Sequence, residues 1–203
     1  MAGKGFLARI VTAVFLVAAG FAGPSPDFAG AAQAAPPGDS RQNAAGLDRL
    51  FAALKTAPNE AAARAIEDTI WRRWMQAPDR HTQGLVREAM ARREVYDFAG
   101  ARALLDEAVA AAPNYAEVYN QRGFVLFLQD DFDAALQDVD RAIELEPRHF
   151  AAMAGRALIL MRQGRHRLAQ AQLRRAVAIH PFLKERSLIV GEPEKPPRPG
   201  VDL

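Results

Sequence analysis

The sequence contains no cysteine, only three serines and only four lysines among its 203 residues. Without cysteine, the chain cannot form a disulfide, use a thiol nucleophile or bind a metal through thiolates. None of the serines, Ser25, Ser40 and Ser187, lies in the G-x-S-x-G turn that exposes a hydrolase nucleophile. These absences exclude disulfide scaffolds, thiol enzymes and hydrolases of that serine type.

Histidine is also sparse, and its spacing does not suggest a metal or catalytic site. The four histidines are His81, His149, His166 and His180, and no two of them are spaced i, i+4 as ligands on one helix face would be. The segment 131–133 begins like a calcium loop, but no third oxygen ligand and no glycine follow at the required spacing. We therefore expect no catalytic residue, no metal and no cofactor.

The charges of the chain are nearly balanced. Lysine and arginine number 26 and aspartate and glutamate 24, which gives a formal net charge of +2. A balance of this kind argues against a nucleic-acid-binding surface. Nearly all the cations are arginine, and an alanine- and arginine-rich, lysine-poor chain is typical of GC-rich bacterial genomes.

The most informative pattern is a repeat of 34 residues, marked by Pro113, Pro147 and Pro181. Laid over one another, the three units share small residues at their eighth, twentieth and twenty-seventh positions. The units are 82–115, 116–149 and 150–183, and the small residues are Ala89, Gly123 and Ala157, then Ala101, Ala135 and Ala169, then Ala108, Ala142 and Ala176. A fixed period of this length predicts a stacked array of helical repeats.

Helix packing explains the pattern. Each unit reads as two helices joined by a short polar turn, and small residues are needed where the two helices cross. Bulky residues then fill the space between successive units. Proline ends each unit because it cannot continue a helix, and the acidic residues of the 129–133 turn are expected to cap the second helix of the middle unit.

The middle unit resembles the tetratricopeptide repeat (TPR) family. The residues that carry the resemblance are Tyr119, Gly123, Leu126, Phe132, Ala135, Ala142 and Pro147. The third unit has Ala157 in place of the usual glycine and His166 in place of the usual aromatic, and we expect His166 to be a packed residue. The first unit departs further, with Tyr96 where glycine often lies. The resemblance implies an all-α fold, a right-handed α-solenoid of stacked antiparallel helix pairs.

The N-terminal segment is of a different kind. Lys4 and Arg9 lie beside an apolar run over residues 10–22, and an A-x-A sequence follows at residues 32–34. A positive start, a short apolar run and such a site predict a secretory signal peptide over residues 1–34. We expect it to be removed and the protein to be periplasmic, with no stable membrane span afterwards; the alternative is an uncleaved anchor.

Between the signal and the repeats, we expect a flexible linker over residues 35–42 and a helical hairpin over residues 43–78. Apolar residues share one face in each half of this hairpin. They are Leu47, Leu50, Phe51 and Leu54 in the first helix, and Ile66, Ile70 and Trp74 in the second. The hairpin lacks the small-residue signature, so we interpret it as a degenerate N-terminal repeat. Trp71 and Trp74 are expected in its core, with a ligand-binding aromatic pair as the alternative.

After the last repeat, residues 184–203 are expected to form a short closing segment and a proline-rich tail. Residues 183–190 are a candidate for a short helix that covers the last unit. The apolar content beyond Gly191 is too low for independent folding. Residues 196–199 resemble a polyproline ligand, and a solvated tail is the alternative.

The TPR resemblance also implies a binding surface, a concave groove lined by the first helix of each unit. Its predicted partner-binding residues are Arg87, Met90, Arg93, Asn120, Gln121, Phe124, Phe127 and Arg162. Apolar area next to arginine and amide donors suits an acidic peptide or partner helix. The positions of the family's carboxylate clamp carry Val86, Met90, Gln121, Ala151 and Gly155, so we expect no such clamp. The alternative is that Met90 and Phe124 only pack against the next unit.

These observations predict a non-catalytic scaffold or adaptor in the bacterial periplasm that binds another protein or a peptide in the groove. The alternative is a non-catalytic accessory subunit of an envelope or cytochrome maturation system. We expect no nucleic-acid partner.

Overall fold

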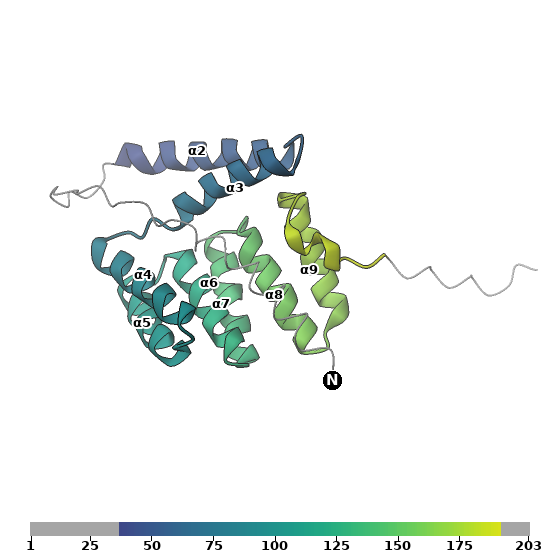
Figure 1. The fold of residues 1–203 in the computed structure, drawn as a ribbon. Coiled ribbons are helices and arrows are strands. Elements are labelled where there is room, and N and C mark those ends of the chain that lie inside the picture. The colour runs from purple at the N-terminus through teal and green to yellow at the C-terminus, as the bar shows by residue number, and fades with distance from the viewer. Residues whose placement is uncertain (1–36, 192–203) are drawn as a thin grey trace, which may run out of the picture.

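The fold is built entirely from helices. In a computed structural model, residues 37–191 are described, and within them lie eight α-helices, one 3-10 helix and no strand (Figure 1). The helices are α2 (Pro37–Lys55), α3 (Glu60–Trp74), α4 (Arg80–Glu94), α5 (Phe98–Ala111), α6 (Ala116–Leu128), α7 (Phe132–Leu145), α8 (Phe150–Arg162), α9 (His166–Ile179) and the 3-10 helix η2 (Lys184–Leu188). The predicted signal peptide and the tail beyond residue 191 lie outside the described residues.

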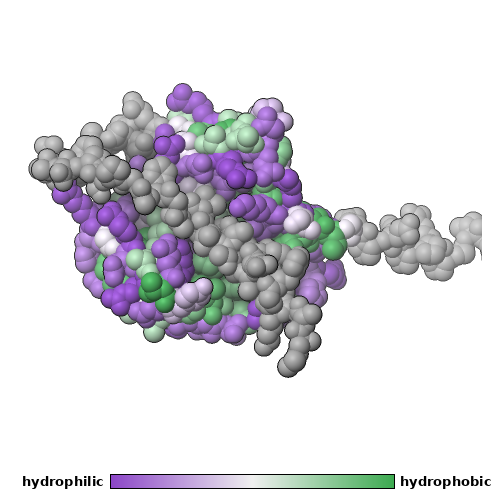
Figure 2. All heavy atoms as spheres, viewed as in Figure 1, coloured by the Kyte–Doolittle hydropathy of each residue, from purple (hydrophilic) through white to green (hydrophobic). Residues whose placement is uncertain are grey.

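Helices α4 to α9 form three antiparallel pairs that stack side by side (Figure 1). The pairs are α4 with α5, α6 with α7, and α8 with α9, and they repeat at the 34-residue period. This arrangement confirms the predicted all-α solenoid of helix pairs. On the face shown in Figure 2 the surface is mainly hydrophilic, and hydrophobic side chains gather in small groups.

The small residues of the repeat lie where paired helices cross. All nine of them are buried. A Cβ atom at Gly123 would lie 3.0 Å from Val139 Cγ1 and 3.3 Å from the Ala135 carbonyl oxygen, both on α7. The closeness of α6 and α7 at this point explains why a larger residue is absent there.

Aspartate side chains cap the N-terminal ends of α4, α5 and α7. Asp79, Asp97 and Asp131 accept hydrogen bonds from the backbone N–H groups three residues later, at the starts of α4, α5 and α7. Each cap satisfies a donor that has no partner within the helix. The predicted acidic cap in the 129–133 turn is therefore confirmed at Asp131.

The turn inside each pair requires a left-handed residue. Tyr96, Asp130 and Gly164 occupy equivalent positions and have φ values of 63°, 60° and 74°. Aspartate and glycine tolerate this conformation well, whereas tyrosine is costly there. The Tyr96 side chain is nevertheless 82% exposed, and its ring contacts only Phe98 among the aromatic residues described in the structure, at 6.0 Å.

The α2–α3 hairpin (residues 37–74) does not stack in front of α4 as a first repeat. It lies across the ends of the array, over the connections between successive units (Figure 1). Trp74 stacks on His149 with ring centroids 4.0 Å apart, and Trp71 meets Phe150 edge to face at 6.4 Å. Tyr115 Oη donates to the Trp74 carbonyl oxygen over 2.7 Å.

This placement differs from the degenerate repeat expected from the sequence, and the indole rings account for the difference. Two tryptophans need a broad aromatic surface, and the connections that carry His149, Phe150 and His180 provide it. The expected use of Trp71 and Trp74 in a core is confirmed, because both are buried. Helix α2 begins at Pro37, so residues 37–42 belong to a helix and not to the linker expected there.

The C-terminal end of the array is covered by the segment around η2. Leu188 and Ile189 pack against the small apolar cluster of Ala157, Leu160, Ala169 and Leu173. Gln170 holds this segment with two hydrogen bonds, to the Leu188 carbonyl and from the Val190 N–H. The expected closing segment therefore exists, as a 3-10 helix.

Candidate functional site

The candidate groove is the side of the array formed by α4, α6 and α8, the first helices of the three pairs. Helix α6 contacts both α4 and α8, so the three helices form one continuous surface. All eight predicted partner-binding residues lie on these helices. The structure therefore brings them onto a single layer, as the resemblance implied.

The predicted residues differ greatly in exposure. Arg87 and Arg162 are exposed, and Met90 is half-buried. The other five are at most 7% exposed: Arg93, Asn120, Gln121, Phe124 and Phe127. The side chains available at the surface are therefore the arginines on α4 and α8, and those of α6 form the floor between them.

A buried carboxylate organises the polar part of this floor. Glu117 is 1% exposed and accepts hydrogen bonds from Gln121 Nε2 over 2.5 Å and from Asn120 Nδ2 over 3.2 Å. The Nε2 atom of His149 lies 2.9 Å from the other carboxylate oxygen of Glu117. Three partners compensate for the cost of placing this acidic group inside the protein.

His149 connects the groove floor to the hairpin. Its Nδ1 atom accepts the Ala152 backbone N–H at the start of α8 over 3.2 Å. Because Nδ1 accepts, the ring proton of neutral His149 is on Nε2, which donates to Glu117. The face of the His149 ring stacks on the indole ring of Trp74 in the hairpin.

No specific role was predicted for Glu117 or His149. Glu117 is the only acidic residue in the otherwise apolar and neutral-polar first turns of α6 and α8, and this contrast was the available signal. Nothing in the sequence pairs Glu117 with His149, which lies 32 residues away and in the connection to the next unit.

Arg93 is bonded within the chain and is not presented to a partner. Its Nη1 atom donates to Gln121 Oε1 over 2.6 Å, and its guanidinium lies 5.0 Å from the centroid of the Phe124 ring. Burial lowers the pKa of Arg93, and the charges of Glu94 and Glu117 partly oppose that effect. Of the three predicted arginines, Arg87 and Arg162 are the ones whose side chains are exposed.

One acceptor in the floor has no partner. Asn120 is fully buried, its Nδ2 atom is used by Glu117, and its Oδ1 atom accepts no hydrogen bond. A buried acceptor without a donor costs about 1–3 kcal/mol. Because Asn120 does not reach the surface, this cost falls on the folded chain.

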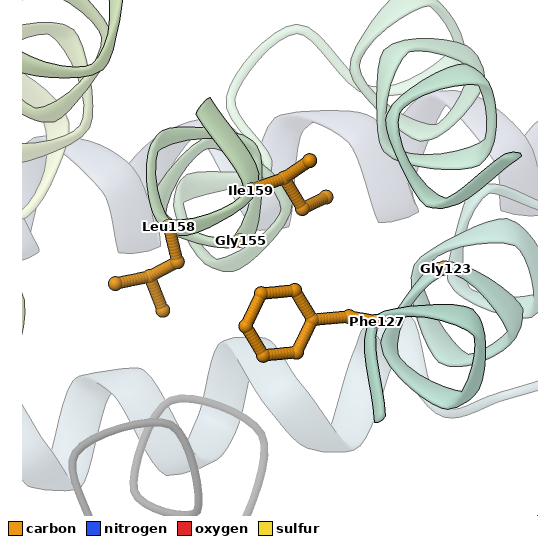
Figure 3. Close-up of a pocket in the computed structure, with 5 residues that line it drawn as sticks. All are labelled: Gly123, Phe127, Gly155, Leu158 and Ile159. Atoms are coloured by element: carbon orange, nitrogen blue, oxygen red, sulfur yellow. The ribbon is translucent and has the colours of Figure 1, made fainter. Parts of the chain in front are cut away.

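The apolar part of the site lies between α6 and α8. Figure 3 shows a small pocket lined by Gly123, Phe127, Gly155, Leu158 and Ile159, with the Phe127 ring directed toward α8. Arg162 continues this side of the site: its guanidinium lies 5.9 Å from the Phe127 ring centroid and 3.1 Å from an Asp130 carboxylate oxygen.

Within residues 37–191, no three histidine or acidic side chains are arranged to hold a metal ion. In the same part of the chain, no helix has the length and apolarity needed to cross a membrane.

Comparison with known proteins agrees with the repeat. The tetratricopeptide repeat family model matches residues 116–149. A TPR repeat-containing protein of Rhizobium etli is 31% identical over 135 residues, 66% of each chain. Tetratricopeptide repeat protein 36 of Xenopus tropicalis is 33% identical over 127 residues, 60% of this chain and 62% of that one. The chain thus spans less than two thirds of either relative.

Solved structures of MamA also align. One from Desulfovibrio magneticus RS-1 is 18% identical with a TM-score of 0.47, covering 72% of this chain and 78% of that chain. Another MamA crystal structure is 17% identical with a TM-score of 0.47, covering 76% and 98%. Likenesses of this size say nothing about what the chain binds. The repeat signature, the family match and the stacked helix pairs agree with one another, and the chain is a tetratricopeptide-repeat protein.

Proposed function

We propose that the protein is a non-catalytic scaffold of the bacterial periplasm that holds a peptide or a helix of another protein in the groove of α4, α6 and α8. The observation that carries this proposal is the pair of exposed arginines, Arg87 on α4 and Arg162 on α8, on either side of the largely buried α6. Guanidinium groups form charge-assisted hydrogen bonds with carboxylates, so acidic side chains of a bound segment would pair with these arginines.

The side chains around α6 define what such a segment would contain. Arg87 on α4 and Arg162 on α8 are exposed on either side of α6 and suit acidic side chains. Phe127 provides an aromatic anchor beside the small pocket. A short acidic segment with one or two apolar residues matches this combination.

The first experiment identifies the partner by position. A photo-reactive amino acid placed at Arg87 or Arg162 is expected to cross-link a partner in the native cell compartment, and the adduct is then identified by mass spectrometry. The matched control is Arg141, which is partly exposed on α7 outside the groove and should give no adduct.

The second experiment measures binding of the identified partner. Phe127→Ala is expected to weaken the complex by at least about 2 kcal/mol, and Arg87→Ala is expected to reduce mainly the on-rate and its salt dependence. Circular dichroism should show an intact fold for both variants. If these changes leave the affinity intact and Arg141→Ala lowers it, the partner binds the outer face and the groove proposal is wrong.

A further inference from the structure

The balanced net charge of the chain conceals a strong segregation of charge along the array. Residues 116–149 contain eight acidic residues against three arginines. Residues 150–191 contain eight arginines or lysines against a single acidic residue, Glu185, which is buried. The last helix pair is therefore a cationic end that follows an acidic middle unit.

Inside the array, arginines are neutralised by a repeated contact between units. Arg122 on α6 pairs with Asp106 on α5 over 3.0 Å, and Arg156 on α8 pairs in the same way with Asp140 on α7. The two pairs are related by the 34-residue period. The bidentate contact between Arg122 and Asp138 also raises the pKa of Arg122 above its ordinary value.

The last helix departs from this pattern. The position occupied by Asp106 in α5 and Asp140 in α7 is occupied by Arg174 in α9. Helix α9 contains no acidic residue. Among the described residues, no acidic side chain pairs with Arg167, Arg174 or Arg175; Arg174 bonds the Val190 carbonyl, and Arg175 lies 3.5 Å from Gln172 Oε1.

These arginines share the outer side of α9 with small and apolar residues. The buried side of the helix is formed by Ala169, Gln172, Leu173 and Ala176. The opposite side, which we call the basic face, is exposed: Arg167, Leu168, Ala171, Arg174, Arg175 and Ala178. Leu168 is 49% exposed and is one of the four large hydrophobic residues with high exposure in the described part of the chain.

We propose that the basic face of α9 docks the protein on an anionic lipid surface. A helix side that combines unpaired arginines with an exposed leucine and small residues is suited to the headgroup region of a bilayer. The face lies on the last α-helix of the array (Figure 1), and it is formed by a single helix.

Docking of this kind is independent of the groove. The basic face lies on α9, and the groove is formed by α4, α6 and α8. A protein bound through α9 would keep the groove open to a partner, so the two proposals can fail separately.

The test is co-sedimentation of the full chain with phosphatidylcholine vesicles that contain or lack phosphatidylglycerol. The readout is the ratio of the two partition coefficients, which removes any binding that does not depend on lipid charge. We expect a ratio well above one that falls as salt is added. Each basic residue at such a surface changes the partition by about fivefold, so the triple variant Arg167→Gln, Arg174→Gln, Arg175→Gln should lower the ratio by roughly 100-fold.

The matched control removes three exposed arginines from the hairpin: Arg49→Gln, Arg64→Gln and Arg72→Gln. It changes the net charge equally and should leave most of the ratio intact. Equal losses in the two triple variants would mean that net charge alone is sensed, and the proposal would be overturned. Equal partition into vesicles with and without phosphatidylglycerol would overturn the proposal. If the protein then bound poly-glutamate and this binding required the three α9 arginines, the basic face would be assigned to an acidic protein.

Discussion

At the scale of single residues, the same amino acid has opposite roles at two places in the array. Gly123 lies at the closest approach of α6 and α7, where a Cβ would meet Val139 at 3.0 Å. Gly84 occupies the middle of α4, and a Cβ there would meet no atom within 4 Å. The first glycine is required by packing, and the second only weakens its helix.

This contrast gives a paired prediction. Gly84→Ala should raise the free energy of unfolding by about 0.5–1 kcal/mol, because alanine is the better helix former. Gly123→Leu should lower it by about 1–3 kcal/mol, because the added side chain forces α6 and α7 apart, and Gly123→Ala should lie between the two variants. Thermal melts measure all three. Equal melting temperatures for Gly123→Leu and Gly123→Ala would show that the helix crossing lies elsewhere.

At the scale of elements, the hairpin is held on the array by a few aromatic contacts. Trp74 is 8% exposed and contacts the rings of Phe51, His149 and Phe150. Ion pairs at the rim, Arg148 with Asp48 and Arg186 with Glu60, are largely exposed and contribute little. Docking of the hairpin therefore depends on the indole rings and on the contact of Glu67 with the buried His180.

We accordingly expect Trp74→Ala to cost about 3–5 kcal/mol, the usual range for a buried tryptophan. The loss should be local, so limited proteolysis should cleave the hairpin while α4 to α9 remain protected. Arg64→Ala, on the exposed side of α3, is the control and should change stability by less than about 0.5 kcal/mol. Uniform loss of protection over α4 to α9 would show that the hairpin is part of one cooperative unit with the array.

A second element, η2, contains a buried acidic group. Burial raises the pKa of Glu185, and the neighbouring Glu67 carboxylate raises it further. One oxygen of Glu185 has no hydrogen-bond partner. Below the carboxyl pKa of the unfolded chain, about 4.3, both states hold the proton and the group has no effect. As the pH rises through the folded-state pKa, the folded protein has to bury the charge and stability falls.

Glu185→Gln should therefore be more stable than the unmodified protein at neutral pH and equally stable in acid below the unfolded pKa. Melting temperatures across this pH range test the expectation. The exposed Glu144→Gln serves as the control, and its difference from the unmodified protein should not grow with pH. A constant difference for Glu185→Gln at all pH values would indicate a change in packing and not in charge.

At the scale of the whole molecule, the proposed location depends on residues 1–34. The positive start, short apolar run and A-x-A sequence predict cleavage between Ala34 and Ala35. Intact-mass analysis of protein from the native compartment should give the mass of residues 35–203. Replacing Ala34 with arginine should block processing and leave the longer chain. A full-length, membrane-embedded product from the unaltered gene would contradict export with cleavage.

The sequence by itself determined the helical repeat. The small residues at Ala89, Gly123 and Ala157, the unit-ending prolines and the acidic turn before α7 are local signals that recur every 34 residues. Periodicity of this kind reports contacts between neighbours in the chain and between identical positions of successive units. For that reason the helix pairs, their order and the crossing at Gly123 could be predicted.

Only the tertiary structure decided where the hairpin lies and which residues form hydrogen bonds in the groove floor. The contacts of Trp74 with His149 and of Glu117 with His149 join residues that belong to no repeating pattern. A single aromatic or acidic residue carries no sign of its distant partner in the sequence. Nor could the burial of Arg93 and its hydrogen bond to Gln121 be predicted from the sequence. The exposure of a side chain depends on which residues it meets once the helices have stacked.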